Sequence, residues 1–240
     1  MEKLSIAQRE QTIAENLQFI DARICEAAEK SGRSRSAIRL MAVTKTVEPV
    51  FINHAIACGV DLIGENKVQE FLGKQPYLNL DHVEAHLIGH LQTNKVRQIV
   101  PHVSMIQSVD SLKLAKEIDK QCEKIAKTMD CLVEVNIAGE ESKTGLPKED
   151  LEPLLEEMAK MAHVRVLGLM TIPPICDENE KLCAYFQKMH AMFVDIGRKN
   201  IDNINMQILS MGMSSDYALA IECGANLVRI GSSIFGPRLY

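Results

Sequence analysis

Hydrophobic and polar residues alternate along this chain with two different periods, one typical of helices and one typical of strands. The first segment has the helical period. Ser5 and Gln8 have the spacing of a capping box, and Gly32 follows the last turn. The pattern therefore predicts a helix from Ser5 to just before Gly32. Its apolar face contains Ile6, Ile13, Leu17, Ile20, Ile24 and Ala28.

Short apolar runs at eight later places predict strands. These runs lie at 39–44, 60–63, 85–88, 103–106, 132–135, 164–170, 206–209 and 227–230. The segments between them carry helical periodicity, as at 112–125 and 182–196. Strands that alternate with helices indicate repeated βα units and a parallel sheet.

Such a sheet can have either of two architectures. A doubly wound open sheet usually has five or six strands, whereas a barrel has eight strands and about 250 residues. The eight runs within 240 residues favour the barrel. We therefore expect an α/β fold, a TIM-like (β/α)8 barrel with an extra N-terminal helix, in a single domain that spans 1–240.

Composition narrows the classes of function. Hydrophobic residues make up 46% and charged residues 25%, as in ordinary globular proteins. A net charge of −5 without a basic stripe argues against a nucleic-acid partner. No apolar run is long enough to span a membrane, and the N-terminus does not read as a signal peptide. Seven cysteines without a CxxC pair predict reduced core thiols in the cytoplasm.

Glycine and hydroxyl residues follow the last two predicted strands. Ser214 and Ser215 precede a short helical run at 217–222, and Gly231 and Ser232 follow the final strand directly. In barrels, such strand exits commonly form a phosphate site. The alternative is purely local, with Ser-Ser-Asp at 214–216 as the cap of the short helix and Gly231 as a turn.

Two cations accompany these exits. Lys45 follows the first strand. It is either a solvated lysine or an amine beside a cavity that can form a Schiff base with an aldehyde. Arg229 lies within an apolar strand, where it needs either a structural carboxylate or a ligand at the barrel mouth. A lysine, an arginine and a phosphate cradle on one face suggest a phosphorylated aldehyde cofactor, for which pyridoxal 5′-phosphate (PLP) is the obvious candidate.

Other motifs with known chemistry do not occur in the sequence. It contains no HExxH, no paired cysteines and no GxSxG, so we expect no metal site and no nucleophile elbow. The segment 59–64 has the glycine spacing of a P-loop, but Glu65 and Asn66 follow where that motif has Lys and Ser or Thr.

Five ordered motifs resemble the pyridoxal phosphate homeostasis protein family. They are MAVTK at 41–45, GENKVQE at 64–70, HLIGHLQTNK at 86–95, LSMGMSSD at 209–216 and VRIGSSIFGPR at 228–238. The resemblance extends over nearly the whole chain. It implies a barrel similar to the N-terminal domain of alanine racemase, with PLP held on Lys45 as an internal aldimine.

The resemblance also implies roles for individual residues. Ser214, Gly231 and Ser232 would hold the phosphate. Arg229 would face the pyridine nitrogen, and Asn66 would lie near the phenolic side of the ring. The residues expected at the cofactor, called the cofactor set below, are Lys45, Asn66, Ser214, Ser215, Arg229, Gly231 and Ser232.

A loop at 139–145 adds one further candidate. Its Lys143 matches a lysine-bearing loop of the family. A direct role at the cofactor competes with the plainer interpretation of a solvated loop lysine.

Two functions of different class remain for a PLP-binding barrel. One is a carrier or buffer in vitamin B6 and amino-acid homeostasis, and the other is an amino-acid racemase. A racemase needs a base on each face of the cofactor, and in alanine racemase the second base comes from a domain after the barrel. Here nine residues follow Gly231, so we expect the outer face to be exposed to water.

The expected charge state of the cofactor ring also favours the carrier. An arginine at the pyridine nitrogen keeps that nitrogen neutral and makes the cofactor a weaker electron sink, although racemases of this fold share the arginine. We therefore assign no catalytic residue. We expect a monomeric cytoplasmic protein that holds PLP and either buffers it or delivers it to apo PLP-dependent enzymes.

Overall fold

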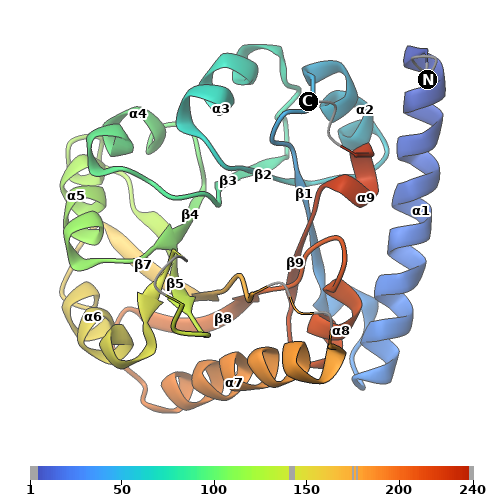
Figure 1. Cartoon of the computed structure of the whole chain (residues 1–240). Coiled ribbons are helices and arrows are strands. Elements are labelled where there is room, and N and C mark those ends of the chain that lie inside the picture. The colour runs from blue at the N-terminus through green and yellow to red at the C-terminus, as the bar shows by residue number, and fades with distance from the viewer. Residues whose placement is uncertain (1–4, 141–143, 175, 177, 238–240) are drawn as a thin grey trace.

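The computed structural model describes residues 5–140, 144–174, 176 and 178–237. Lys143 and Arg238 therefore lie outside the described residues. Eight parallel strands form a closed ring with helices around its outside (Figure 1). The strands are β1 (Arg39–Val43), β2 (Leu62–Glu65), β3 (Glu84–Leu87), β4 (Met105–Val109), β5 (Met129–Asn136), β7 (Val164–Met170), β8 (Ile204–Ser210) and β9 (Leu227–Ile230).

The strands pair in the order of the sequence, which confirms the predicted (β/α)8 barrel. β9 pairs with β1, and the β4–β5 pairing completes the ring. A two-residue strand, β6 (Leu146–Pro147), pairs with the end of β5. The connecting helices are α2 (Pro49–Ala57), α3 (Val68–Lys74), α4 (Val96–Ile99), α5 (Leu112–Glu123), α6 (Leu151–Met158), α7 (Asn179–Arg198) and α8 (Tyr217–Glu222), and α9 (Ser232–Phe235) follows β9.

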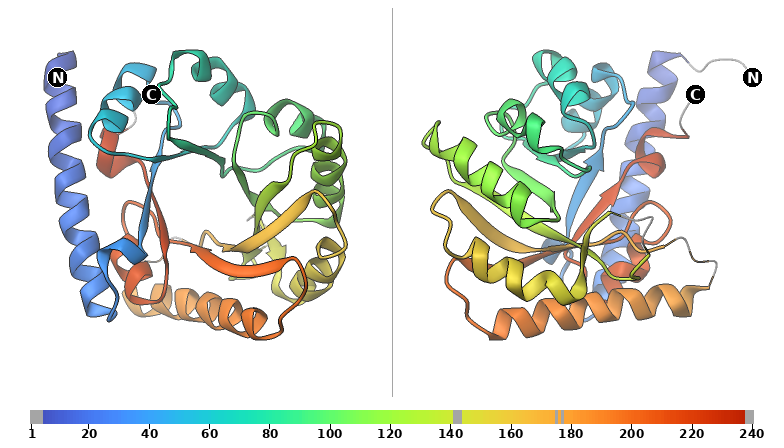
Figure 2. Two further views of the ribbon diagram at one scale, coloured as in Figure 1. Left: turned by 180° about the vertical axis from the view of Figure 1, so that it is seen from behind. Right: turned by 60° about the vertical axis from the view of Figure 1, so that its left-hand side comes forward.

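The extra N-terminal helix, α1 (Ile6–Lys30), forms as the capping pattern predicts. The Ser5 hydroxyl accepts the amide N–H of Gln8 at 3.2 Å, and the Gln8 side chain accepts the amide N–H of Ser5 at 2.8 Å. Gly32, in the left-handed region at φ 72°, follows the helix end. The helix stands outside the ring beside α2, α8 and α9 (Figure 2).

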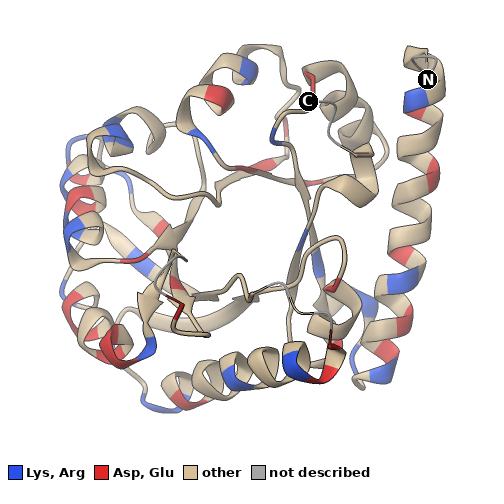
Figure 3. Ribbon diagram, viewed as in Figure 1, with Lys and Arg blue, Asp and Glu red and all other residues tan. Residues whose placement is uncertain are grey.

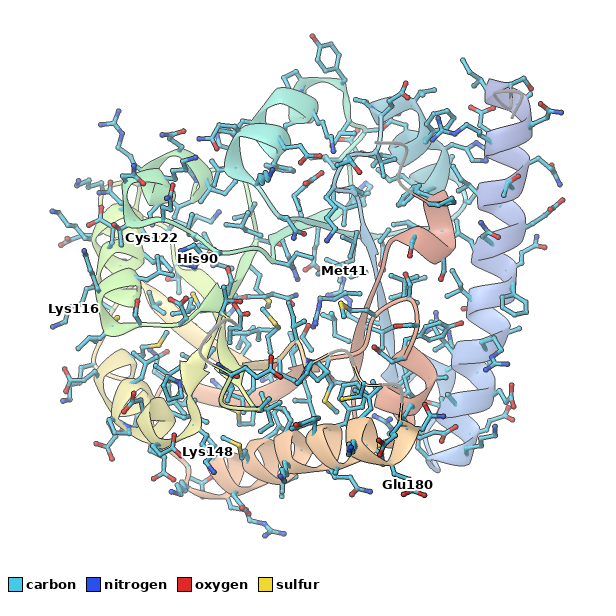
Figure 4. The ribbon with its side chains drawn as sticks, viewed as in Figure 1. Met41, His90, Lys116, Cys122, Lys148 and Glu180 are labelled. Carbon is cyan, nitrogen blue, oxygen red and sulfur yellow. The ribbon has the colours of Figure 1, made fainter. Side chains whose placement is uncertain are left out.

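Apolar side chains fill two compartments. The larger one lies between the barrel and its helices and includes the buried face of α1. Each large side chain buried there contributes about 1.5–3 kcal/mol relative to exposure. Inside the ring, Met41 (Figure 4) belongs to one small cluster and Leu132 to another, and Ile208 touches both.

The charged residues are spread over the outer surface. Lysines and arginines alternate with aspartates and glutamates along the outer helices, without a basic stripe (Figure 3). Among the described residues, no helix combines the length and the apolar character that a membrane crossing requires.

The predicted strands agree with the observed ones except at their ends. The bounds of β7 and β9 match the prediction, whereas β5 has eight residues instead of four. Polar residues interrupt the apolar run of β5, and one of them, Glu134, is buried at 2% exposure. The prediction of 132–135 already includes Glu134. It misses 129–131 and 136, where the polar residues Asp130 and Asn136 interrupt the apolar pattern.

Candidate cofactor site

A cavity of about 290 Å³ lies at the carboxyl ends of the barrel strands. This is the face that carries the chemistry in barrels of this kind. The predicted cofactor set comes together here, because all of its members line the cavity. The remaining lining residues are Val43, Ile88, Ile172 and Met213.

Lys45 stands just after β1, where the backbone is held in an unusual conformation. The side chain is half-buried and lines the cavity. The next residue, Thr46, has a φ of 63°, in the left-handed region that β-branched residues avoid. The Thr46 hydroxyl donates to the Lys45 carbonyl at 2.6 Å, and the Thr46 amide donates to the Glu70 carboxylate. These bonds hold the strained turn that follows Lys45.

A buried ion cluster braces this turn from behind. The Lys74 ammonium group donates to the Thr44 carbonyl at 2.8 Å, to Glu65 at 2.8 Å and to Glu70 at 2.6 Å. The Thr44 hydroxyl also donates to Glu65, at 2.9 Å. The cluster therefore joins the end of β1 to β2 and α3. Thr44, Glu65 and Glu70 lie in the motifs at 41–45 and 64–70, but Lys74 lies outside them, so the sequence does not show that the four side chains meet.

Burial and charge oppose each other in this cluster. Burial raises the pKa of Glu65, and the hydrogen bond and charge of Lys74 offset part of that rise. Burial also acts to raise the pKa of Glu70. Hydrogen bonds from Lys74 and the Thr46 amide outweigh it, so the pKa of Glu70 is lowered. Lys74 thus favours the ionised form of both carboxylates beside the Lys45 turn, against the effect of burial.

One serine hydroxyl connects the segment after β8 to the segment after β9 by hydrogen bonds. The Ser214 hydroxyl oxygen accepts the amide N–H of Gly231 at 3.2 Å and that of Ser233 at 3.3 Å. The sequence-based alternative of a serine cap on α8 is wrong, because no side chain caps this helix. The carboxylate of Asp216, the residue before α8, instead accepts the Met213 amide at 2.6 Å. Ser233 was missing from the predicted set.

Arg229 is 3% exposed and reaches the cavity from β9. It donates to the Ser210 hydroxyl at 2.6 Å and to the Thr171 carbonyl at 2.9 Å. The partners described for this guanidinium are therefore neutral, which favours the second sequence-based alternative, a side chain directed to the barrel mouth. Burial lowers the pKa of Arg229 to about 10, and the charges of Glu134 and Asp216 oppose that shift.

Asn66 carries an unmet hydrogen-bonding group. Its Oδ1 is buried and has no hydrogen-bond partner within the described part of the chain. The exit of β3 packs closely against it, since a Cβ added at Gly89 would lie 2.3 Å from the Asn66 carbonyl oxygen. A buried acceptor without a partner costs about 1–3 kcal/mol of stability. We therefore expect a ligand in the cavity to donate a hydrogen bond to this atom.

Among the described residues, no three His, Cys, Asp or Glu side chains are grouped so that they could hold a metal ion. A smaller cavity of about 160 Å³ adjoins the first on the side of α1. Lys45, Gly231 and Ser232 line both cavities, and Arg9 of α1 lines the smaller one.

Comparison with known proteins identifies the family. Residues 13–238 match the family model of the alanine racemase N-terminal domain. The chain is 42% identical to the pyridoxal phosphate homeostasis protein of Aquifex aeolicus over 226 residues, which cover 94% of this chain and 98% of that protein. It is 39% identical to the protein of the same name from Pseudomonas aeruginosa, with coverage of 95% and 97%.

Solved structures agree with the sequence comparison. PipY of Synechococcus elongatus, solved with PLP bound, has a TM-score of 0.83 and 31% identity, with coverage of 93% of this chain and 100% of PipY. Alanine racemase from Corynebacterium glutamicum shares the fold at a TM-score of 0.72 and 14% identity, and the match covers 62% of that enzyme and 95% of this chain. By these matches, the chain belongs to the pyridoxal phosphate homeostasis protein family, built on the alanine racemase N-terminal fold.

Proposed function

We propose that this protein binds PLP in the mouth cavity through Lys45 and serves as a carrier or buffer of the cofactor. The observation that carries the proposal is the gathering of a lysine, a buried guanidinium and a Ser–Gly–Ser exit around one cavity. The names of its relatives and the PLP complex of PipY support the choice of ligand.

The residues of the cavity fit this cofactor. Asn66 Oδ1 is a buried acceptor that lacks a donor, and PLP carries a ring hydroxyl. The amides of Gly231 and Ser233 already converge on one oxygen atom, as amides that bind a phosphate oxygen do. Arg229 brings a fixed donor group to the cavity for a ring nitrogen. These are the three kinds of polar group that PLP presents besides its aldehyde.

Each side chain then has a defined task. When bound, PLP supplies an aldehyde that condenses reversibly with a primary amine. Lys45 provides the amine, and the braced turn after it limits the directions the side chain can take. Ser214, Gly231 and Ser232 hold the phosphate. Arg229 donates to the ring nitrogen and, as a strong base, withholds its own proton from it.

Carrier rather than racemase is the function we propose. Arg229 leaves the ring nitrogen neutral, which limits stabilisation of negative charge at the reacting carbon. The likeness to alanine racemase, at 14% identity, concerns the fold. A racemase would exchange the α-proton of an amino acid with solvent deuterium. We expect the holoprotein to give no more exchange than free PLP, and faster exchange would favour the racemase.

Direct transfer to apo enzymes extends the proposal. Ser215 and Ser232 are exposed at the cavity rim, so solvent and partners can reach a bound ligand. The holoprotein is mixed with an apo PLP enzyme while a trap consumes free PLP. Reactivation faster than spontaneous release supports direct transfer, and reactivation at the release rate argues against it.

We also propose a monomer in the cytoplasm. Large exposed apolar side chains are distributed over separate segments rather than one face, for example Phe19 on α1, Tyr77 after α3 and Ile125 after α5. The odd number of cysteines agrees with a reducing compartment. Sedimentation equilibrium of the holoprotein tests the monomer, and a stable dimer would contradict it.

Binding itself is tested by titration with PLP, followed by the absorption of the bound cofactor. Lys45→Ala should abolish the absorption change that the wild type gives. Lys67→Ala is the matched control, because Lys67 is an exposed lysine near the same cavity that does not line it. Equal titrations for wild type and Lys45→Ala would refute the assignment of Lys45.

A further inference from the structure

The interior of the barrel contains a row of buried polar side chains, of which only Arg229 belongs to the cofactor set. His86, Gln107 and Ser210 are each exposed by 1% or less, and Arg229 by 3%. They come from β3, β4, β8 and β9. The two interior apolar clusters lie beside this row. One comes from β1 and β2 with Leu227 of β9, and the other from β5 and β7 with Met105 of β4. Polar groups in such a place must be hydrogen-bonded, and each of these is.

The bonds form a continuous chain. Arg229 donates to the Ser210 hydroxyl at 2.6 Å, and that hydroxyl donates to Gln107 Oε1 at 2.7 Å. The amide nitrogen of Gln107 lies 2.9 Å from His86 Nδ1. His86 Nε2 lies 3.2 Å from the Glu84 carboxylate.

The charged ends fix the direction of this chain. A guanidinium can only donate, and a carboxylate can only accept. The Ser210 hydroxyl therefore receives from Arg229 and donates its single proton to Gln107. The amide of Gln107 then donates to His86 Nδ1, so the imidazole proton sits on Nε2 and points to Glu84. Every link donates in the direction from Arg229 to Glu84.

The chain connects the two ends of the barrel. Arg229 lines the cofactor cavity at the carboxyl ends of the strands. Glu84 is the first residue of β3 and pairs at 3.0 Å with Arg39, the first residue of β1. The side chains of this pair are 47% and 38% exposed. A surface ion pair at the base is thus linked to the guanidinium at the mouth.

A proton on His86 Nδ1 would break this order. Both imidazole nitrogens would then donate, and Gln107 would have to turn its oxygen toward His86 and its NH₂ group toward Ser210. The Ser210 hydroxyl would lose its acceptor and would be shared between two donors. The hydrogen bond that holds Arg229 would weaken as a result.

We propose that His86 and Gln107 are positioning residues that hold the Arg229 guanidinium toward the cofactor ring, and that protonation of His86 loosens this hold. The inference rests on the proposed function, in which Arg229 faces the ring nitrogen. The groups around His86 are Glu84 on its own strand, Gln107 on β4, Arg39 on β1 and Asp130 on β5. Burial outweighs the two carboxylates and lowers the pKa of His86, so the neutral tautomer is the native form near neutral pH.

The first test needs no cofactor. Imidazole ¹⁵N NMR of the wild-type protein reports which ring nitrogen of His86 carries the proton. The proposal requires the Nε2–H tautomer near neutral pH, with and without PLP. An Nδ1–H tautomer, or a doubly protonated ring at that pH, would overturn it even if every variant below failed to fold.

The second test measures the PLP dissociation constant against pH. Gln107→Leu cuts the chain and should weaken binding about three- to tenfold near neutral pH, as expected for the loss of one buried hydrogen bond. His86→Gln keeps an acceptor for Gln107 and a donor for Glu84 but cannot take up a proton. It should bind like the wild type near neutral pH and lack the loss of affinity that the wild type shows as His86 becomes protonated.

His102→Gln is the matched control, because His102 is an exposed histidine outside the chain of hydrogen bonds. It should reproduce the wild-type pH profile. Wild-type affinity in Gln107→Leu, or a wild-type pH profile in His86→Gln, would overturn the proposal. Absence of saturable PLP binding by the wild type would instead refute the proposed function, so the two failures are distinguishable.

Discussion

Replacement of Lys74 by methionine tests whether the buried ion cluster supports the turn at Lys45. Methionine keeps most of the apolar stem and removes the ammonium group that Thr44, Glu65 and Glu70 share. The side chains of Lys74 and Glu65 are 13% and 2% exposed, so water replaces little of the lost interaction. Breaking a buried pair in this way costs about 3–5 kcal/mol of unfolding free energy. We expect the lower end, because Glu70 is 22% exposed.

The cost should depend on pH in a defined direction. Loss of Lys74 removes the two largest interactions that lower the pKa of Glu65, so burial raises that pKa further above 4.5. A carboxyl whose pKa is higher in the folded state binds its proton more tightly there, and stability falls as pH rises from 4.5 through the folded-state pKa. The variant should therefore lose more stability at about pH 8 than at about pH 5.

Urea unfolding followed by circular dichroism measures both quantities. The Glu26–Lys30 pair provides the control. It has the same i,i+4 spacing as the Glu70–Lys74 pair, at 2.8 Å against 2.6 Å, but it is exposed. Lys30→Met should leave the free energy of unfolding and its pH dependence unchanged. A cost for Lys74→Met below about 1 kcal/mol, or an equal cost at both pH values, would refute the reasoning.

Three further predictions concern other parts of the fold. Gly168→Ala should destabilise the protein by at least about 2 kcal/mol in the same unfolding assay. The added Cβ would lie 1.9 Å from the Ile208 carbonyl oxygen, and the backbone φ of Gly168 is 151°. A smaller cost would mean that β7 and β8 can adjust. Glu84→Gln should flatten the acid limb of the stability curve. The neighbouring imidazole lowers the pKa of Glu84 to about 2, so its contribution is present above 4.5 and is lost as pH falls toward 2; an unchanged limb would contradict this. Ser214→Ala should raise the PLP dissociation constant about three- to tenfold, while the exposed Ser36→Ala should not; equal affinities would remove Ser214 from the phosphate site.

Much of the fold follows from the sequence because barrel strands alternate with amphipathic helices. The count of strands, the helix after Ser5 and the bounds of β7 and β9 are predictable for that reason. The ends of β5 are not, because Asp130 and Asn136 are polar and interrupt the apolar pattern there. Strand ends depend on tertiary pairing that no local pattern encodes.

Some residues of the site are likewise predictable from the sequence, and others are not. Lys45 and Arg229 are recognisable because one is a cation directly after an apolar strand and the other is a cation within one. The cluster around Lys74 joins residues nine positions apart on different elements, and the chain through His86 takes its residues from β3, β4, β8 and β9. Only the closure of the barrel brings such residues together. The predicted serine cap failed because Ser214 bonds across to β9 rather than along its own segment.

The most direct test of the central claim is intact mass after borohydride reduction of the PLP-loaded protein, with peptide mapping. We expect one reduced pyridoxyl-phosphate adduct, located on Lys45, in the wild type and in Lys67→Ala. An unmodified chain after incubation with excess PLP, or an adduct on another lysine, would contradict it.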